Sequence, residues 1–93
     1  MIYYYILIDP DKPRKTKVGI TKNPNRRIKS YRTSAPGCFF KKIYEIPDKI
    51  HEKKILNELR AVFRVQSEYV HCHPDLVQNI IESYLDDNDI PYQ

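Results

Sequence analysis

Residues 2–8, with the sequence IYYYILI, constrain the fold of this chain more than any other segment. Successive side chains of an extended strand point to opposite faces of a sheet. A strand with one face in water alternates apolar and polar residues, whereas this segment is apolar on both faces. The segment therefore predicts a strand in the middle of a sheet that is covered on both sides.

The same segment does not have the features of a secretion signal, since it lacks a basic start and a small-residue cleavage site. It leads directly into Asp9-Pro10-Asp11, which is typical of a turn. No stretch approaches the roughly eighteen consecutive apolar residues that a membrane span needs. We expect a cytoplasmic protein with no membrane partner, in which Cys38 and Cys72 are free thiols.

The rest of the chain predicts strands and helices within one domain of residues 1–93. Asn23 can cap a helix and Pro24 suits its first position, so we expect a helix to start there. Apolar residues recur at helical spacing in two later segments. Strands are expected at residues 16–21 and 38–46, helices at 24–32, from about 48 and from 74, and a short extended segment at 64–70.

This order, β-β-α-β-α-(β)-α, indicates an α/β (α+β) domain. We expect a small central three-stranded sheet, mainly antiparallel because the first connection is short, with helices packed on it. The stretch after residue 85 is acidic, with Asp86, Asp87 and Asp89, and we expect residues 86–93 to form a frayed tail.

The net charge of +4 conceals a strong asymmetry along the chain. Residues 11–42 carry eleven Lys or Arg and one acid, whereas residues 45–93 carry five bases and ten acids. Positive charge concentrated on a third of a small domain attracts polyanions, although a solvated Lys-rich surface would give the same count. The Arg-containing helix and the nearby aromatic residues favour a nucleic-acid partner.

Gly19 stands in the middle of the second predicted strand, eight residues before Arg27. Glycine weakens the interior of a strand and usually marks a bulge or the close approach of another group. We therefore expect another group to approach the backbone at Gly19.

The residues around Gly19 resemble the core of the GIY-YIG nuclease superfamily. The similar residues are Tyr3 to Asp9, Lys17 to Thr21, and Arg27, in the order and spacing of the branch found in phages and their hosts. The resemblance covers residues 2 to about 70. It implies a divalent-metal-dependent endonuclease that hydrolyses phosphodiester bonds in DNA, with a glycine that lets backbone and side chains crowd around a phosphate.

The resemblance places Tyr5 at the first family tyrosine, which acts as the general base or relays a proton to it. A free tyrosine has a pKa near 10, so such a site must lower the pKa of Tyr5. Tyr3 lies on the same face of the strand and is the second choice, whereas Tyr4 points to the opposite face and is expected in the core. Tyr31, one turn beyond Arg27, either assists or merely packs.

Lys17 stands where the founding pattern has its second tyrosine, as is common in the phage-type branch. A lysine can hold a phosphate or depress the pKa of Tyr5, but it cannot reproduce the chemistry of a phenol. Arg27 is implied to bind phosphate, because its planar donor fork suits two phosphate oxygens. The further cations expected to contact the nucleic acid are Arg14, Lys15, Lys22, Arg26, Lys29 and Arg32.

The resemblance also implies one metal-binding glutamate on a later helix, and Glu52 fits that pattern. One carboxylate with waters and a substrate phosphate commonly holds Mg²⁺, for which Mn²⁺ can substitute. Glu58 is the rival, although it faces away from Glu52 around a helix. Glu68 lies in a segment similar to the closing motif of the branch, where it either orients a base or a phosphate-binding cation or is structural. Ser67 stands where the family has glycine, which leaves the local turn open.

Two alternatives stay open beside the nuclease. One is a catalytically inactive nucleic-acid-binding module with a nuclease-like fold, and the other is a phage factor that acts through protein interaction or inhibition. The expected partner is duplex or branched DNA, with RNA as an alternative, for a monomer or weak homodimer in the host-cell cytoplasm. The chain has only two glycines and no phosphate-binding loop motif, so nucleotide hydrolysis and dinucleotide chemistry are poorly supported.

Overall fold

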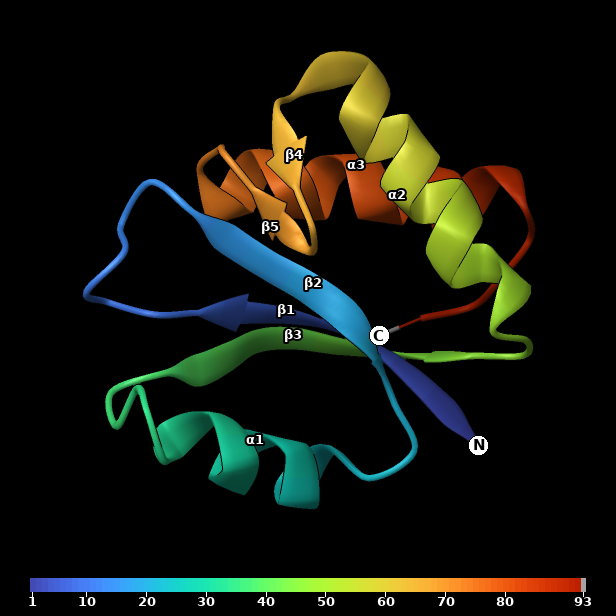
Figure 1. The fold of residues 1–93 in the computed structure, drawn as a ribbon. Helices are drawn as coiled ribbons and strands as arrows, with labels where there is room; N and C mark the ends of the chain where they lie inside the picture. The colour runs from blue at the N-terminus through green and yellow to red at the C-terminus, as the bar shows by residue number, and fades with distance from the viewer. Residues whose placement is uncertain (93) are drawn as a thin grey trace.

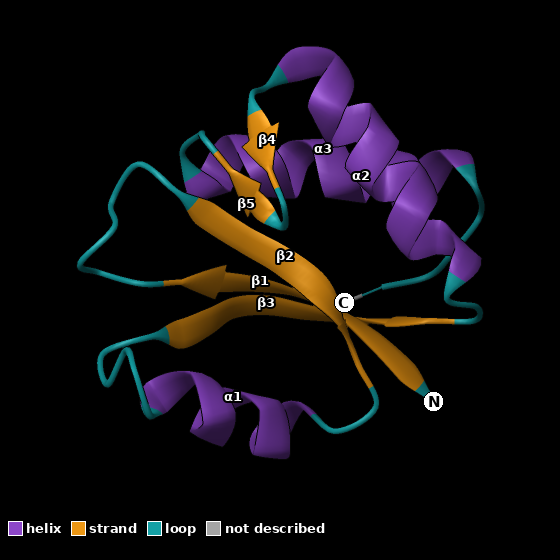
Figure 2. Cartoon of the chain, viewed as in Figure 1, coloured by secondary structure: helices purple, strands orange, loops and turns teal. Residues whose placement is uncertain are grey.

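The computed structural model describes residues 1–92, which form one antiparallel sheet and three helices (Figure 1). The five strands lie in the order β3-β1-β2-β5-β4. The strands are β1 (Ile2–Ile8), β2 (Thr16–Thr21), β3 (Phe39–Ile46), β4 (Val65–Gln66) and β5 (Tyr69–Val70), and the helices are α1 (Pro24–Arg32), α2 (Ile50–Val62) and α3 (Pro74–Asp87). Helix α1 covers one face of the sheet, and α2 and α3 cover the other (Figure 2).

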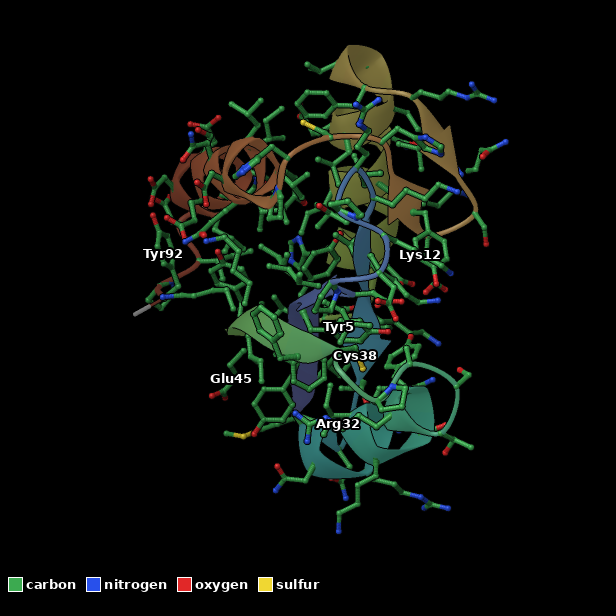
Figure 3. All side chains as sticks on the ribbon, turned by 90° about the vertical axis from the view of Figure 1, so that its left-hand side faces the viewer. Tyr5, Lys12, Arg32, Cys38, Glu45 and Tyr92 are labelled. Carbon is green, nitrogen blue, oxygen red and sulfur yellow. The ribbon has the colours of Figure 1, made fainter. Side chains whose placement is uncertain are left out.

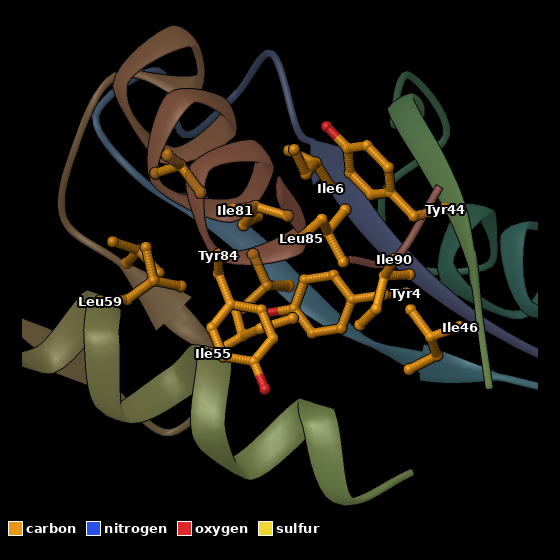
Figure 4. Close-up of a cluster of buried hydrophobic side chains, with 13 residues drawn as sticks. Tyr4, Ile6, Tyr44, Ile46, Ile55, Leu59, Ile81, Tyr84, Leu85 and Ile90 are labelled. Carbon is orange, nitrogen blue, oxygen red and sulfur yellow. The ribbon is translucent and has the colours of Figure 1, made fainter. Parts of the chain in front are cut away.

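Strand β1 lies in the middle of the three long strands, as its two apolar faces predict. It pairs antiparallel with β2 on one side and with β3 on the other. Tyr4 and Ile6 join the larger core under α2 and α3, which Figure 4 shows in close-up. Tyr5 and Leu7 point the other way into a smaller core under α1. The α/β (α+β) prediction is confirmed, although the sheet has five strands where three were expected.

The two additional strands come from residues 64–70, which were expected as one short extended segment. These residues form a β4–β5 hairpin, and β5 pairs with Thr16 and Lys17 of β2. Ser67 begins the two-residue turn with φ 56°, a left-handed conformation that usually favours glycine. The hairpin was missed because each strand has only two residues, too few to show an alternating pattern.

The prediction of a frayed tail was wrong for the part that the structure describes, because α3 continues through Asp87. Beyond it, the backbone N–H of Ile90 donates to the carbonyl of Leu85 at 2.9 Å, and the Ile90 side chain is buried in the larger core. The Tyr92 ring meets the Tyr44 ring edge-on at 5.7 Å between centroids. In residues 86–92 the acidic side chains are exposed, whereas Ile90 and Tyr92 pack against the rest of the domain. Gln93 lies outside the described residues.

Helix α1 starts as predicted, with the Asn23 side chain accepting a hydrogen bond from the Arg26 backbone N–H at 3.1 Å. None of its residues is fully buried, and Ile28 and Tyr31 are the two that pack on the smaller core. Most of the helix surface therefore carries basic side chains into solvent. Cys38 and Cys72 are free thiols, as expected, and none of the helices within residues 1–92 has the length and apolar character needed to cross a membrane.

Candidate active site

Gly19 marks a close approach of two side chains to strand β2. Tyr5 lies directly opposite Gly19 in the β1–β2 register, on the face covered by α1. A Cβ atom at residue 19 would stand 2.6 Å from the Tyr5 hydroxyl oxygen and 3.2 Å from Oε2 of Glu68. Both separations are shorter than an ordinary van der Waals contact, so any side chain at this position would displace one of the two groups. The expected close approach at Gly19 is thus observed.

The Tyr5 hydroxyl is bonded to a second tyrosine. Its oxygen lies 2.6 Å from the hydroxyl oxygen of Tyr31 on α1, and either atom can donate the hydrogen. The two rings meet edge-on at 6.1 Å, and Phe40 of β3 packs against Tyr5 at 5.1 Å. Figure 3 shows Tyr5 and Cys38 between the sheet and α1. Tyr31 therefore does more than pack, since it holds the hydroxyl of the leading candidate base.

The surroundings raise the pKa of Tyr5 instead of lowering it. Burial is the largest cause, followed by the hydrogen bond to Tyr31 and by the charge of Glu68. The charge of Arg27 acts in the opposite direction but does not overcome them. The protein groups alone do not supply the depressed pKa that a free phenolate base would need. Tyr5 is accordingly a neutral phenol at physiological pH.

Lys17 projects from β2 onto the same face of the sheet as Gly19 and lies over the Tyr31 ring. Its Nζ is 3.8 Å from Oε2 of Glu68, 5.0 Å from the centroid of the Tyr31 ring and 4.8 Å from that of Tyr69. A cation over an aromatic face is stabilised by the ring quadrupole. Lys17, Tyr31 and Tyr69 line a cavity of about 240 Å³ together with Lys15, one of the cations expected to contact nucleic acid.

Arg27 lies on the exposed side of α1, close enough to Tyr5 for its charge to act on the phenol. With Lys22 and Arg26 it lines a surface hollow of about 450 Å³ at the start of the helix. A hollow edged by three cations can accept an anionic group such as a phosphate. Arg27 was expected to bind phosphate and Lys22 and Arg26 to contact nucleic acid; the fold brings the three to one hollow.

The other cations predicted to contact nucleic acid differ in how free their side chains are. Arg14 and Lys29 are exposed, on the β1–β2 connection and on α1 respectively. Arg32 is exposed too, but its Nε donates a hydrogen bond to the Cys38 carbonyl at 3.1 Å. That bond ties the end of α1 to the start of β3, so Arg32 has a structural role as well.

Tyr3 and Tyr4 lie outside the group around Tyr5. The Tyr3 hydroxyl donates to Sδ of Met1 at 3.6 Å, near the other end of β1. Tyr4 is buried on the opposite face in the larger core, as expected. Its hydroxyl has no hydrogen-bond partner within residues 1–92, and burial, with the charges of Glu52 and Glu68, raises its pKa.

Glu52 of α2 is partly buried. Burial and the charge of Glu68 raise the pKa of its carboxyl above the usual value, and the backbone N–H of Ile20 on β2 acts in the opposite direction. Glu58, the rival on the same helix, is exposed, and its charge acts on Tyr84 of α3 instead. Glu52 is thus the helix carboxylate that the fold brings to the strand bearing Gly19 and Lys17.

The donor atoms near β2 suit a hard cation. Residues 1–92 contain no group of three or more His, Cys, Asp or Glu side chains that could hold a metal ion. Mg²⁺, however, is usually bound through one or two carboxylates, with waters and substrate phosphates completing its shell. The single partly buried carboxylate of Glu52 is compatible with that requirement.

Sequence reasoning did not place Glu68 and Tyr69 at this site. Both come from the β4–β5 turn and β5, which meet β2 through a pairing distant in sequence. The similarity of their segment to a family motif marked Glu68 as a candidate, but it did not show that its carboxylate lies over Gly19.

Comparison with family models gives a match to the T5orf172 domain over residues 2–85. The chain belongs to the T5orf172 domain family. This phage-associated domain occurs in the context of GIY-YIG and HNH-like nucleases, although no match is specific to the GIY-YIG superfamily itself. No curated protein and no solved structure matches the chain. Membership of the T5orf172 family indicates a nuclease-like or DNA-binding role for the chain.

Proposed function

We propose that this T5orf172 domain is a divalent-metal-dependent endonuclease of the GIY-YIG type that hydrolyses phosphodiester bonds in DNA. The observation that supports it most is the arrangement around Gly19, where the Tyr5 hydroxyl bonds to Tyr31 and lies in the field of Arg27, and where Lys17 lies over the Tyr31 ring. A hydrogen-bonded phenol in the field of an arginine, with a lysine nearby, can serve phosphodiester hydrolysis by handling protons and binding phosphate.

In this proposal Arg27 and Lys17 bind the phosphate that is attacked. Charge on the phosphoryl oxygens increases in the transition state, and fixed cations that face those oxygens stabilise it without reorganising. Arg27 offers two parallel donors, whereas Lys17 acts as a point charge held against Tyr31 and Tyr69. The exposed cations on α1 and on the β1–β2 connection hold the flanking phosphates.

Tyr5 and Tyr31 form a proton relay that needs no phenolate. The attacking water gives a proton to the Tyr5 oxygen while Tyr5 passes its own proton to Tyr31, which releases one to solvent. The 2.6 Å separation of the two hydroxyl oxygens suits such a concerted transfer. A relay is consistent with the raised pKa of Tyr5, which argues against a phenolate that waits for substrate.

Glu52 is the residue that would hold Mg²⁺ or Mn²⁺ in this proposal. If Glu52 held such a cation, the cation would supply polarisation of the phosphodiester and stabilisation of the leaving oxygen. The chain itself contributes a partly buried carboxylate on α2 whose pKa is influenced by Ile20 of β2.

A nucleic-acid-binding module without catalysis is the second candidate. Two observations favour it, namely Lys17 in place of the second family tyrosine and a Tyr5 side chain that is only 1% exposed. The Tyr5 hydroxyl is buried and hydrogen-bonded to Tyr31, so it must become accessible before it can accept a proton from a water molecule beside the substrate phosphate.

Conversion of supercoiled plasmid separates the two candidates. We expect the wild-type protein to nick plasmid in Mg²⁺ or Mn²⁺ but not in EDTA. Glu52→Ala should abolish nicking while gel-shift affinity for the same DNA in EDTA is kept. Glu58→Ala is the matched control on the same helix and should nick at the wild-type rate. Metal-independent DNA binding with no nicking by any protein would favour the binding module.

A further inference from the structure

A cavity of about 240 Å³ lies beside the residues that we propose for the reaction, and Tyr31 and Lys17 are part of its lining. The β1–β2 connection, the loop after α1 and strand β5 supply most of the rest. Figure 3 faces the side of the molecule with the β1–β2 connection and shows two of the lining residues, Lys12 and Cys38. Pockets for drug-sized ligands usually enclose about 300–1,000 Å³, so this cavity suits a smaller group.

We propose that the cavity takes one unpaired base of the DNA, from the nucleotide next to the phosphate that is cleaved. The inference rests on the proposed function, because Lys17 lines the cavity and is also assigned to that phosphate. A base and its phosphate belong to one nucleotide. A phosphate held by Lys17 therefore brings a neighbouring base within reach of the cavity.

Part of the lining is apolar, which favours a base over a phosphate. Leu7 and Cys38 are buried members of the smaller core, and Ala35 packs against that core. Charged oxygens that meet such a surface lose their water without gaining a hydrogen bond, whereas the faces of a base are themselves largely apolar. The rings of Tyr31 and Tyr69 line the same cavity, and aromatic rings are surfaces on which proteins stack unpaired bases.

The charges in the lining nearly balance, as a neutral ligand requires. Three lysines and two aspartates line the cavity, which leaves one net positive charge, and Glu68 lies 3.8 Å from one of these lysines, Lys17. The charged residues of the lining are Lys12, Lys15, Lys17, Asp9 and Asp11. By contrast, the hollow at the start of α1 has three cations and, among residues 1–92, no acid in its lining.

The hollow therefore suits a phosphate, whereas the cavity suits a group that needs both hydrogen-bond acceptors and donors. The edges of bases present both kinds of group. Their amino groups can donate to carboxylates, and their ring nitrogens and carbonyl oxygens can accept from lysine.

Tyr69 keeps two of the lysines at the cavity. The Nζ atoms of Lys12 and Lys17 lie 5.2 and 4.8 Å from the centroid of its ring, within the range of a cation–π interaction. Lys12 forms no ion pair within residues 1–92, so its ammonium group stays available to a ligand. Donors that are in place before binding reduce the entropy that is lost on binding.

A base enters the cavity only when it is outside the stack of the duplex. Extruding a base costs free energy, and the cost is smallest for a nucleotide that is already unpaired or mismatched. The cavity therefore predicts a class of substrate. DNA with an unpaired nucleotide at the point of cleavage is bound more tightly than a fully paired duplex of otherwise the same sequence.

Binding in EDTA, where no cleavage is expected, tests this prediction. Fluorescence anisotropy compares a fully paired duplex, the same duplex with one bulged nucleotide, and that bulge with an abasic site in place of its base. We expect the wild type to bind the bulge about 5- to 100-fold more tightly than the duplex, as the stacking of one base usually gives. The abasic bulge keeps the sugar and the phosphates, so it should bind like the duplex.

Two variants and a matched control locate the effect. Ala35→Leu fills the cavity and Tyr69→Leu removes one of its aromatic rings, so each should remove most of the preference for the bulge. Ala61→Leu makes the same change at the chain's other alanine, an exposed residue of α2, and should keep the preference. Circular dichroism of each variant checks that the fold is retained.

The position of the base is measured with 2-aminopurine as the bulged nucleotide. Acrylamide quenches the fluorescence of a base that solvent reaches, so a base inside the cavity is protected. We expect protection by the wild type and by Ala61→Leu, and its loss in Ala35→Leu and Tyr69→Leu.

The outcomes separate this inference from the proposed function. Equal binding of bulge and duplex by the wild type would overturn the inference, and so would a preference that persists with the abasic bulge or in both Ala35→Leu and Tyr69→Leu. In each of these cases plasmid nicking in Mg²⁺ or Mn²⁺ would leave the nuclease proposal intact. If the wild type protects the bulged base but nicks neither plasmid nor bulged DNA, the base-binding cavity is supported and the nuclease proposal fails.

Discussion

Replacement of Gly19 by alanine tests the geometry on which the candidate site depends. The new Cβ would lie 2.6 Å from the Tyr5 hydroxyl oxygen and 2.9 Å from its Cζ, and 3.2 Å from Oε2 of Glu68. The Tyr5 ring cannot simply rotate away, because it is packed between Tyr31 and Phe40. The ring or strand β2 must therefore move by about 1 Å to reach an ordinary contact distance.

Two magnitudes follow from that displacement. Overpacking in a well-packed core lowers the free energy of unfolding by about 1–3 kcal/mol. Alanine is favoured over glycine in a strand by about 0.5–1 kcal/mol, which offsets part of this loss. We expect the free energy of unfolding to fall by about 0–2.5 kcal/mol in urea titrations. A displacement of about 1 Å at a reacting group costs on the order of 100-fold in rate. Nicking by Gly19→Ala should therefore decrease far more than its stability does.

Gly37→Ala is the matched control, because the chain has one other glycine. A Cβ there would meet only Pro10 atoms, at 3.7 and 3.8 Å, and its φ is not positive. This variant should be as stable as the wild type or slightly more so, with unchanged nicking. Wild-type stability and activity in Gly19→Ala would refute the argument that Tyr5 and Glu68 crowd this glycine.

Three further predictions concern neighbouring groups. Tyr31→Phe removes the hydrogen bond to Tyr5, so it should lower the nicking rate on the order of 100-fold and the free energy of unfolding by about 1 kcal/mol. An unchanged nicking rate would exclude the proton relay. Ser67→Gly should raise the free energy of unfolding by roughly 0.5–1 kcal/mol in urea titrations, since glycine accepts the left-handed conformation, and a loss of stability would contradict this account. The raised pKa of Glu52 means that its ionisation destabilises the metal-free fold, so Glu52→Gln should melt above the wild type at neutral pH. That difference should shrink as the pH falls through the pKa of Glu52, and a constant difference would show that ionisation is not its cause.

The local elements of this fold were predictable because each has its own signal. The two apolar faces of residues 2–8 indicated a central strand, and Asn23-Pro24 indicated the start of α1. The β4–β5 hairpin carries no such signal, since two-residue strands show no period and Ser67 is not a typical residue for its conformation. The tail was misjudged because its charges dominate its composition, whereas Ile90 determines where it lies.

The candidate site was predictable as a set of residues but not as an arrangement. The resemblance to a nuclease core identified Tyr5, Lys17, Arg27 and Glu52 one by one. It did not show that Tyr31 would bond to Tyr5 or that Glu68 would lie over Gly19. Both contacts join segments far apart in the chain, and they depend on how α1 and the hairpin dock on the sheet. Burial, together with these two contacts, raises the pKa of Tyr5, where the resemblance implied that it would be lowered.

The division of the core between the two faces of the sheet explains how these tyrosines are kept in place. The larger cluster, under α2 and α3, contains most of the buried side chains, so it supplies most of the hydrophobic stabilisation. The smaller cluster has Tyr5, Leu7 and Cys38 as its buried members, and α1 adds only partly buried residues to it. Helix α1 is therefore held largely by the Tyr31 hydroxyl, the Arg32 hydrogen bond to Cys38 and limited packing. Arg27 lies on the same helix. The Tyr5–Tyr31 hydrogen bond therefore helps to position the Arg27 guanidinium, and it is also the path along which the proposed relay moves a proton.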